Sequence, residues 1–392
     1  MYESQVKAVA EQISQQPPAF FANSVDRTQL LTETKRVLAN LEKDVARVKQ
    51  EGAILFASGA SEDNSTVAGH KLATAFDKWR EDAPSTVAFM LVAAEKFGLD
   101  AESPNFKAAL MTGLAAEVKH DNAYHSTSHF REVTAVMTRL IGINNELAVS
   151  GTTKGTALLD SDDISKCLAA AAAHDLMHDG KGNTVDGKHE AYRLENKAIG
   201  AAEPFLKLAG VSEKDTEDFR TIIRVTDISA NSGVPPEQRA PSPHKQLRNL
   251  YAEIYEGGKP ATLSPELASL RADPKLLVSA SMMSDADLGP SAATDYAFSR
   301  KMTSLVVAET PSMSDSDGTL VGFMKFVVEN RFTSQAATTG NGQSLTGIFN
   351  EASTRVERAA ALQNTGPAAA APAAPTAPAG TPPKNKAQAA KL

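Results

Sequence analysis

Residues 164–183 read ISKCLAAAAAHDLMHDGKGN, an alanine-rich stretch that ends in two histidines and two aspartates. Alanine is the best helix former and adds little bulk, so the run predicts a closely packed helix. The helix would end where His174 and Asp175 begin the polar segment. Imidazole and carboxylate groups at a buried helix end cost free energy unless something pairs with them. A divalent metal ion is the natural partner, because neutral imidazole and ionised carboxylate are usual metal ligands.

A second pair of histidines lies upstream of this stretch. His125 and His129 are four residues apart in AYHSTSHFREV (123–133), so on a helix they would share one face. Either cluster alone is more often structural than metal-binding. Two such clusters in one helical chain favour a metal site.

Two carboxylates farther along the chain could complete such a site. Asp285 and Asp287 follow an apolar helical stretch in LLVSASMMSDADLGPSA (276–292). Either one would supply the fourth ligand of a site with two histidines and two carboxylates. The alternative is an ordinary helix end, with turn-forming Asp and a Gly-Pro pair. The acidic run at 160–163 is better explained as the N-cap of a helix that begins at Ile164.

The sequence does not indicate other kinds of catalytic site. Cys167 is the only cysteine, which excludes an intrachain disulfide and a cysteine-rich zinc site. On the alanine-rich helix it is best explained as a small core residue. The chain contains no G-x-x-x-x-G-K-[ST] phosphate loop, no G-x-S-x-G elbow and no H-E-x-x-H motif.

The chain as a whole is patterned for helices. Apolar residues recur at helical spacing in segments 87–99, 106–118, 130–142 and 164–176. Strand-like alternation is scarce and aromatic residues make up only 6% of the chain. We therefore predict an all-α fold.

Residues 28–50 form one more amphipathic helix by the same rule, with Thr34 as an interruption. Its apolar stripe consists of Leu31, Leu38, Leu41, Val45 and Val48. The helix either packs on the main body or pairs with a second copy as a short coiled coil, which would make a homodimer.

Three segments are unsuited to a packed core. The polar, small-residue stretch 57–67 predicts a linker, and the proline-rich stretch 231–245 predicts a surface loop. Residues 363–392 are dominated by alanine and proline, which predicts a disordered tail.

The composition bears on partners and location. The net charge of −7 lacks the clustered Lys and Arg of a nucleic-acid-binding protein, so we expect no nucleic-acid partner. The first twenty residues lack a basic region followed by an apolar one, and the chain has no apolar run of about 18 residues. We therefore expect a cytoplasmic protein without a membrane span.

Six segments, in order, resemble the catalytic domain of the class I cyclic-nucleotide phosphodiesterases, within the wider His-Asp (HD-type) metal-dependent phosphohydrolase superfamily. HDLMHDGKGN matches the His-Asp-x-x-His-x-Gly-x-x-Asn signature of that family, and AYHSTSHFREV resembles its Tyr-His-x-x-x-His helix. The other four are RLEN (193–196), VTDIS (225–229), SDADLGP (284–290) and VGFMKFVVENRF (321–332).

The resemblance covers the chain from about Phe76 to about Leu362. It implies a compact multi-helix phosphodiesterase-like catalytic domain at residues 67–362. An N-terminal helical extension and linker would occupy residues 1–66, and the disordered tail residues 363–392.

The resemblance also implies two divalent metals. The ligands of the tighter one, a zinc ion, would be His129, His174, Asp175 and Asp287. The Ala-Asp-Leu context selects Asp287 over Asp285. Asp175 would bridge to a second metal, Mg²⁺ or Mn²⁺, held otherwise mostly by water. His178 would hydrogen-bond those waters, with Glu195 and Asp227 nearby.

The implied activity is hydrolysis of a 3′,5′-cyclic nucleotide, a small-molecule partner. A metal-bridging hydroxide would attack phosphorus in line, with the metals neutralising the developing charge. His125 matches the general acid that protonates the departing oxygen.

The substrate pocket departs from the family pattern. Tyr124, Leu320 and Phe323 match pocket positions, but Leu320 stands where the family has the Gln that reads the purine edge. Loss of such a hydrogen bond costs a buried base edge roughly 1–3 kcal/mol. Asp179 replaces the proline of the His-Asp signature and adds a carboxylate close to the metals. Two alternatives therefore stay open: a phosphohydrolase of the same fold acting on another nucleotide or phosphoester, and a catalytically inactive nucleotide-binding module.

Overall fold

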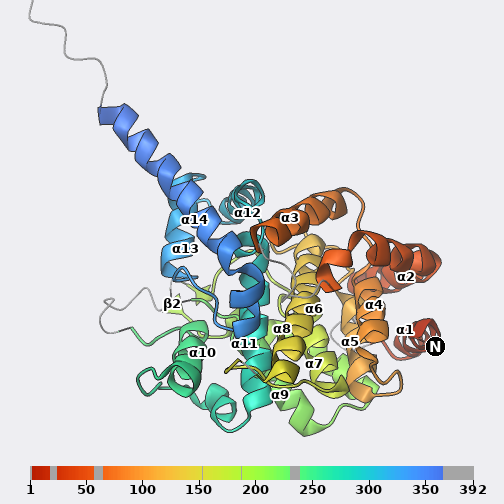
Figure 1. Ribbon diagram of the computed structural model, residues 1–392. Helices are drawn as coiled ribbons and strands as arrows, with labels where there is room; N and C mark the ends of the chain where they lie inside the picture. The colour runs from red at the N-terminus through yellow and green to blue at the C-terminus, as the bar shows by residue number, and fades with distance from the viewer. Residues whose placement is uncertain are drawn as a thin grey trace, which may run out of the picture.

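Figure 1 shows the computed structural model, which describes residues 2–17, 24–56, 65–151, 153–186, 188–229 and 239–364. These residues form helices and helical turns with one short hairpin, so the all-α prediction is confirmed. The elements up to residue 173 are α1 (Tyr2–Gln15), α2 (Ser24–Glu51), η2 (Ala53–Phe56), α3 (Ser65–Glu81), α4 (Thr86–Phe97), α5 (Pro104–Ala115), α6 (Thr127–Ser150) and α7 (Ser161–Ala173).

The second half begins with the hairpin, in which β1 (Thr184–Val185) pairs antiparallel with β2 (Lys188–His189). The helical elements that follow are α8 (Arg193–Ala209), α9 (Glu213–Arg224), α10 (Pro243–Tyr251), η4 (Ala252–Glu256), η5 (Pro265–Arg271), α11 (Pro274–Ala292), α12 (Tyr296–Glu309), α13 (Asp317–Phe326) and α14 (Gln335–Asn364).

Helix α11 runs through the centre of the molecule, with α6 and α7 packed against it (Figure 1). The residues of α11 are almost all buried. Gly289 permits the close approach of α6, because a Cβ there would lie 2.8 Å from Cγ1 of Val136. The contact brings the polar residues of α11 beside those at the start of α6.

The alanine-rich stretch forms α7 and lies against α5, α6 and α11. Its five alanines are 0–2% exposed, so their small side chains allow close packing on several sides. Asp160 caps the helix by accepting hydrogen bonds from the backbone N–H groups of Asp162 and Asp163. The N-cap prediction is thus confirmed, although the helix begins at Ser161 rather than Ile164. It ends at Ala173, with His174 as the C-cap residue.

Helix α2 packs against α4 and α5 of the same chain, which agrees with the first of the two alternatives for residues 28–50. Thr34 and Asp44 belong to its buried face, and Asp44 accepts a hydrogen bond from the backbone N–H of Ser85 at 3.0 Å. The stripe is therefore not interrupted by Thr34. Arg36 of α2 also bonds Glu117, 2.6 Å away, which Arg131 of α6 contacts at the same distance. Pairing with a second copy stays a prediction.

The predicted non-helical segments fall partly outside the described residues. Within the predicted linker, residues 57–64 are not described, and 65–67 already form the first turn of α3. Residues 231–238 of the predicted loop are not described, and 243–245 begin α10, with Pro243 in the first turn, where proline is favoured. Residues 365–392 of the predicted tail are not described.

Among the described helices, none combines the length and apolar character needed to cross a bilayer. The domain boundaries at residues 66 and 362 stay predictions; α14 continues to Asn364.

Candidate metal centre

Four side chains from three helices converge beside the centre of the molecule. His129 lies in the first turn of α6, His174 and Asp175 follow the end of α7, and Asp287 lies on α11. Nε2 of His129 is 3.4 Å from Oδ2 of Asp175 and 3.2 Å from Oδ1 of Asp287. Nε2 of His174 is 3.2 Å and 3.3 Å from the same two oxygens, and the two Nε2 atoms are 3.3 Å apart. The structure thus brings together all four residues expected to hold the tighter metal.

The near-equal spacing fits ligands around one cation. Atoms 3.2–3.4 Å apart at the corners of a tetrahedron lie about 2.0 Å from its centre, and at neighbouring corners of an octahedron about 2.3 Å. These are normal distances from a divalent metal to nitrogen and oxygen. Two imidazoles with two carboxylates suit zinc and neighbouring transition metals.

The orientation of one histidine supports the same assignment. Nδ1 of His174 lies 2.9 Å from the carbonyl oxygen of Ala171, and a carbonyl oxygen only accepts hydrogen bonds. Nδ1 therefore carries hydrogen, and in the neutral ring Nε2 keeps a lone pair directed at the other three ligands. Metal-binding histidines are commonly fixed in this way. Nδ1 of His129 is buried and has no hydrogen-bond partner in the described part of the chain.

The electrostatics of the four-residue metal-ligand group favour the binding of a cation. Burial alone would lower the pKa of His129 and of His174, but the hydrogen bonds and charges of Asp175 and Asp287 raise both. Burial also opposes ionisation of the two carboxyls. The histidines nevertheless hold the pKa of Asp175 well below its usual range and that of Asp287 at about 2. Ionised carboxylates facing imidazoles provide the charge that a cation site requires.

The neighbouring Asp285 is not part of this group. Its oxygens accept hydrogen bonds from the backbone N–H groups of Thr333 and Ser334, at 2.8 and 2.6 Å. Burial raises the pKa of Asp285 to about 6, against the lowering effect of these bonds. Asp285 thus holds the segment before α14, whereas Asp287, two residues later on α11, faces the histidines.

His125 precedes α6 rather than lying on it, so the expectation that His125 and His129 share a helix face is wrong. The helix begins only at Thr127. Nδ1 of His125 lies 2.5 Å from Oε2 of Glu309, and Oε1 of Glu309 accepts the backbone N–H groups of Tyr124 and His125. His125, His178 and Glu309 form a second group of potential ligands, but a 2.5 Å contact leaves no room for an ion between its atoms. The contact is an imidazole–carboxylate hydrogen bond.

His178 stacks on His125, with ring centroids 3.7 Å apart and planes inclined by 19°. Burial lowers the pKa of His178 to about 4. Burial raises the pKa of Glu309, but its hydrogen bond with His125 and the charge of that ring lower it, and the net effect is a lowered pKa. His125 is thus held on one side by a carboxylate and on its face by a neutral ring.

Glu195 and Asp227 line a cavity beside the metal-ligand group that Asp175 and Asp287 also line. Asn183 donates from Nδ2 to Oε2 of Glu195, 3.0 Å away. Burial and the charge of Asp227 raise the pKa of Glu195 to about 8. Asp227 accepts the backbone N–H groups of Tyr192 and Ser229, at 3.0 and 2.8 Å. Both residues can therefore fix hydrogen-bonding groups around a bound metal.

A cavity of about 200 Å³ opens beside the metal-ligand group and is lined by Asp175 and Asp287 together with His125 and His178. The three predicted pocket residues lie elsewhere. Tyr124 is buried with its ring centroid 4.6 Å from that of His129, and Leu320 is 0% exposed in the core. Phe323, half-buried, packs against the core. The structure does not bring Leu320 or Phe323 to the lining of this cavity.

Sequence reasoning missed Glu309, the partner of His125. It lies at the end of α12, 184 residues from His125, and no motif surrounds it. Asp179 was expected to add a carboxylate near the metals, but it instead bonds Arg193 at 2.6 and 2.9 Å and Lys197 at 2.6 Å. These bonds, above all those with Arg193, lower the pKa of Asp179 and tie the metal-ligand segment to α8.

Comparison with known proteins finds matches among solved structures. No model of a protein family and no curated protein matches the chain. Among the solved structures that it resembles is LmjPDEB1, a Leishmania phosphodiesterase, in complex with IBMX. The two are 15% identical, the TM-score is 0.48, and the match covers 80% of this chain and 98% of that one.

Proposed function

We propose that the chain is a metal-dependent phosphodiesterase that hydrolyses a 3′,5′-cyclic nucleotide. The observation that carries the proposal is the juxtaposition of two groups: four ligand atoms spaced for a cation, with Asp175 and Asp287 lining a cavity, and an imidazole held by a carboxylate on the same cavity. The first group suits binding of a phosphoryl oxygen through metal, and the second suits transfer of a proton to a leaving oxygen.

In this proposal His129, His174, Asp175 and Asp287 hold the tighter cation. Asp175, which lines the cavity, would also hold a second one, and zinc with magnesium or manganese is the expected pair. The bound cations supply Lewis acidity and an acidified water at neutral pH. Glu195 and Asp227, on the same cavity, would hydrogen-bond to water there.

His125 is the proposed general acid. Glu309 fixes its Nδ1–H, so Nε2, on the other side of the ring, remains to carry the proton for the leaving oxygen. The stacked ring of His178 keeps His125 from rotating out of the cavity. Such a positioned acid contributes about 10²–10⁴-fold to the rate.

The runner-up is a phosphohydrolase of the same kind that acts on another phosphoester. It is supported by the cavity, whose lining contains neither Leu320 nor Phe323 and therefore offers no nucleobase clamp of the expected form. An inactive nucleotide-binding module would not require the hydrogen-bonded His125 and Glu309 pair.

The test is turnover by the full chain in the presence of Zn²⁺ and Mn²⁺. Cyclic AMP, cyclic GMP and the generic diester bis(p-nitrophenyl) phosphate are offered separately, and products are separated by chromatography. We expect hydrolysis of a cyclic nucleotide, at least 100-fold slower in His125→Asn and unchanged in His70→Asn, whose ring is exposed. Hydrolysis of the generic diester alone would favour the runner-up. Absence of any turnover by metal-loaded protein would contradict both.

A further inference from the structure

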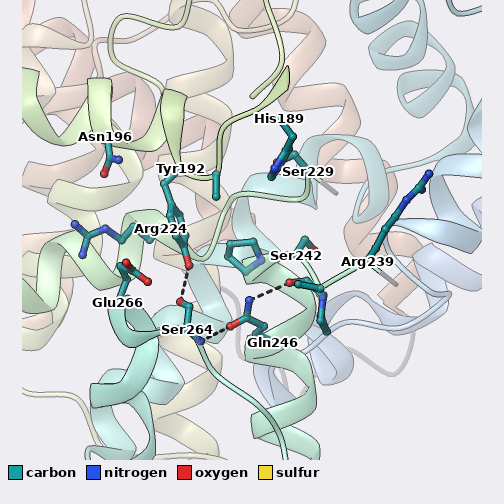
Figure 2. Close-up of a pocket in the computed structure, with 14 residues that line it drawn as sticks. His189, Tyr192, Asn196, Arg224, Ser229, Arg239, Ser242, Gln246, Ser264 and Glu266 are labelled. Atoms are coloured by element: carbon teal, nitrogen blue, oxygen red, sulfur yellow. Dashed lines mark hydrogen bonds between the residues drawn. The ribbon is translucent and has the colours of Figure 1, made fainter. Parts of the chain in front are cut away.

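A second and larger cavity lies next to the cavity beside the metal-ligand group. Its volume is about 700 Å³, within the range of roughly 300–1,000 Å³ typical of small-molecule sites. It is bounded by the start of α8, the end of α9, the start of α10 and the segment leading into η5 (Figure 2). Of the residues that line the metal-side cavity, only Ser229 also lines this one.

One wall of this cavity is a fixed hydrogen-bonded chain (Figure 2). The hydroxyls of Tyr192 and Ser264 are 2.8 Å apart, and the backbone N–H of Ser264 donates to Oε1 of Gln246 at 2.7 Å. Nε2 of Gln246 donates to the carbonyl oxygen of Pro241 at 2.9 Å. The amide of Gln246 is thereby held in one orientation.

Gln246 has hydrogen-bonding capacity left over. A carboxamide has two N–H donors and an oxygen with two lone pairs, and these contacts use one of each. A glutamine amide with one donor and one acceptor available is the group that pairs with the edge of a purine base. Pro241 and Pro243, with the Tyr192 ring, give the cavity apolar surface for a flat ring.

The charge of the cavity favours an anion. Arg224 and Arg239 line it on opposite sides of Tyr192 in the view of Figure 2, and Glu266 is the one carboxylate in the described lining. Arg224 contacts Glu217 at 3.3 Å, but Arg220 holds that carboxylate more closely, at 2.9 Å. Nε of Arg224 is buried without a hydrogen-bond partner among the described residues. Guanidinium groups are the preferred partners of phosphate.

The backbone of Tyr192 has an unusual conformation that places its ring beside this cavity. Tyr192 has a φ of 61°, a left-handed conformation that non-glycine residues seldom adopt. Asp227 holds it there through the backbone N–H, 3.0 Å away. Strained residues of this kind are typical of binding sites, where the surrounding structure keeps them in place. Here the conformation puts the tyrosine ring in the cavity wall.

We infer that this cavity is a second binding site, for a nucleoside monophosphate. Gln246 hydrogen-bonds the base edge, Tyr192 and the prolines contact the base and sugar, and Arg239 binds the phosphate, with Arg224 adding positive charge on the opposite side of Tyr192. The site is independent of the proposed activity, since none of these residues belongs to the metal centre. It is linked to that centre through Ser229, which bonds His189 on one side at 2.9 Å and Asp227 on the other.

The test measures binding of adenosine 5′-monophosphate to the full, metal-loaded chain by calorimetry. Inorganic phosphate and adenosine are titrated in parallel. Arg239→Ala removes a cation and Gln246→Leu removes the amide with little change of shape. Arg355→Ala is the matched control, because it removes an equally charged side chain from α14, outside the cavity lining.

We expect Arg239→Ala and Gln246→Leu each to weaken the binding of this nucleotide at least tenfold, with Arg355→Ala within twofold of wild type. Nucleotide bound at the metal centre does not respond to either substitution, so the variants separate the two sites. Unchanged affinity in either cavity variant, or inorganic phosphate binding as tightly as the nucleotide, would overturn the inference. Circular dichroism confirms that each variant is folded.

Discussion

At the scale of single residues, the contact between His125 and Glu309 has a measurable consequence. Glu309→Gln keeps the size of the side chain but replaces a charged acceptor by an amide, so the imidazole loses its orienting partner. We expect kcat for the susceptible phosphodiester to fall about 10- to 100-fold, with KM nearly unchanged. Glu351→Gln, on the exposed end of α14, is the control.

The metal content separates this positioning role from a structural one. Glu309→Gln should bind as much metal as wild type, because no ligand is altered. A variant that lost metal in proportion to activity would show that Glu309 supports the ligand group rather than the acid.

A second residue-scale prediction concerns Asp285, which sequence reasoning weighed against Asp287 as a ligand. Its two oxygens accept two backbone N–H groups, and Asn can accept only one of them. The other N–H would face an amide donor inside the protein. Asp285→Asn should therefore lower the free energy of unfolding by about 1–3 kcal/mol, measured by urea denaturation, and leave metal content unchanged. If Asp285→Asn lost metal but unfolded at the same urea concentration as wild type, Asp285 rather than Asp287 would be the metal ligand.

Residue types and spacing carried the metal-ligand prediction because the ligands lie in short motifs at helix ends. His174 and Asp175 are adjacent in sequence, and the structure places His174 3.3 Å from His129 and Asp287 and Asp175 3.4 Å from His129. Glu309 could not be found in this way. Its role depends on the end of α12 lying beside residues 124 and 125, and a glutamate near the end of a helix is not distinctive.

At the scale of elements, a substitution in α2 tests whether its apolar stripe packs against the same chain or against a second copy. Leu41 is 3% exposed, on the helix that packs against α4 and α5. Leu41→Ala should lower the free energy of unfolding by about 2–4 kcal/mol, independently of protein concentration. Lys43→Ala, on the exposed face, should change it by less than about 0.5 kcal/mol. If Leu41→Ala instead dissociated a dimer at unchanged stability, the stripe would act between copies.

Helices α10 and α11 are joined by a buried histidine, which predicts a pH dependence. Burial, with the nearby charge of Arg248, lowers the pKa of His244 to about 3, and its Nδ1 lies 2.5 Å from Oγ of Ser284. The unfolded chain binds a proton below pH 6.5, whereas the folded protein does not until about pH 3. Stability from this group is therefore complete above pH 6.5 and declines as the pH falls.

Between pH 7 and pH 5 this histidine should cost about 2 kcal/mol of stability. His244→Gln does not titrate, so its urea midpoint should fall less than that of wild type over the same interval. Parallel pH profiles for the two proteins would show that His244 is already accessible to protons in the folded state.

Helical periodicity predicted the existence of α2, α4, α5, α6 and α7, but not every boundary. His125 precedes α6 because the helix starts only at Thr127, after Ser126 in an extended conformation. A spacing of four residues does not reveal such a start. The buried face of α2 is also less purely apolar than predicted. Thr34 and Asp44 are buried among its apolar residues, and Asp44 accepts a backbone hydrogen bond.

At the scale of the whole molecule, the three motifs that contain the expected metal ligands meet at one place although they are far apart in the sequence. Segments from α6, α7 and α11 converge because these three helices pack on one another. The cavity of about 700 Å³ was beyond prediction, since its walls come from four separated segments without a shared motif. The placement of Leu320 in the core likewise depends on how α13 packs.

Metal content tests the metal centre most directly. Wild-type protein, His174→Ala and the control His70→Ala are equilibrated with Zn²⁺ and Mn²⁺, passed through a desalting column and measured by mass spectrometry. We expect at least one tightly held divalent ion per chain in wild type and in His70→Ala, whose histidine is exposed, and less than a tenth of that in His174→Ala. Equal metal content in wild type and His174→Ala would contradict the metal centre.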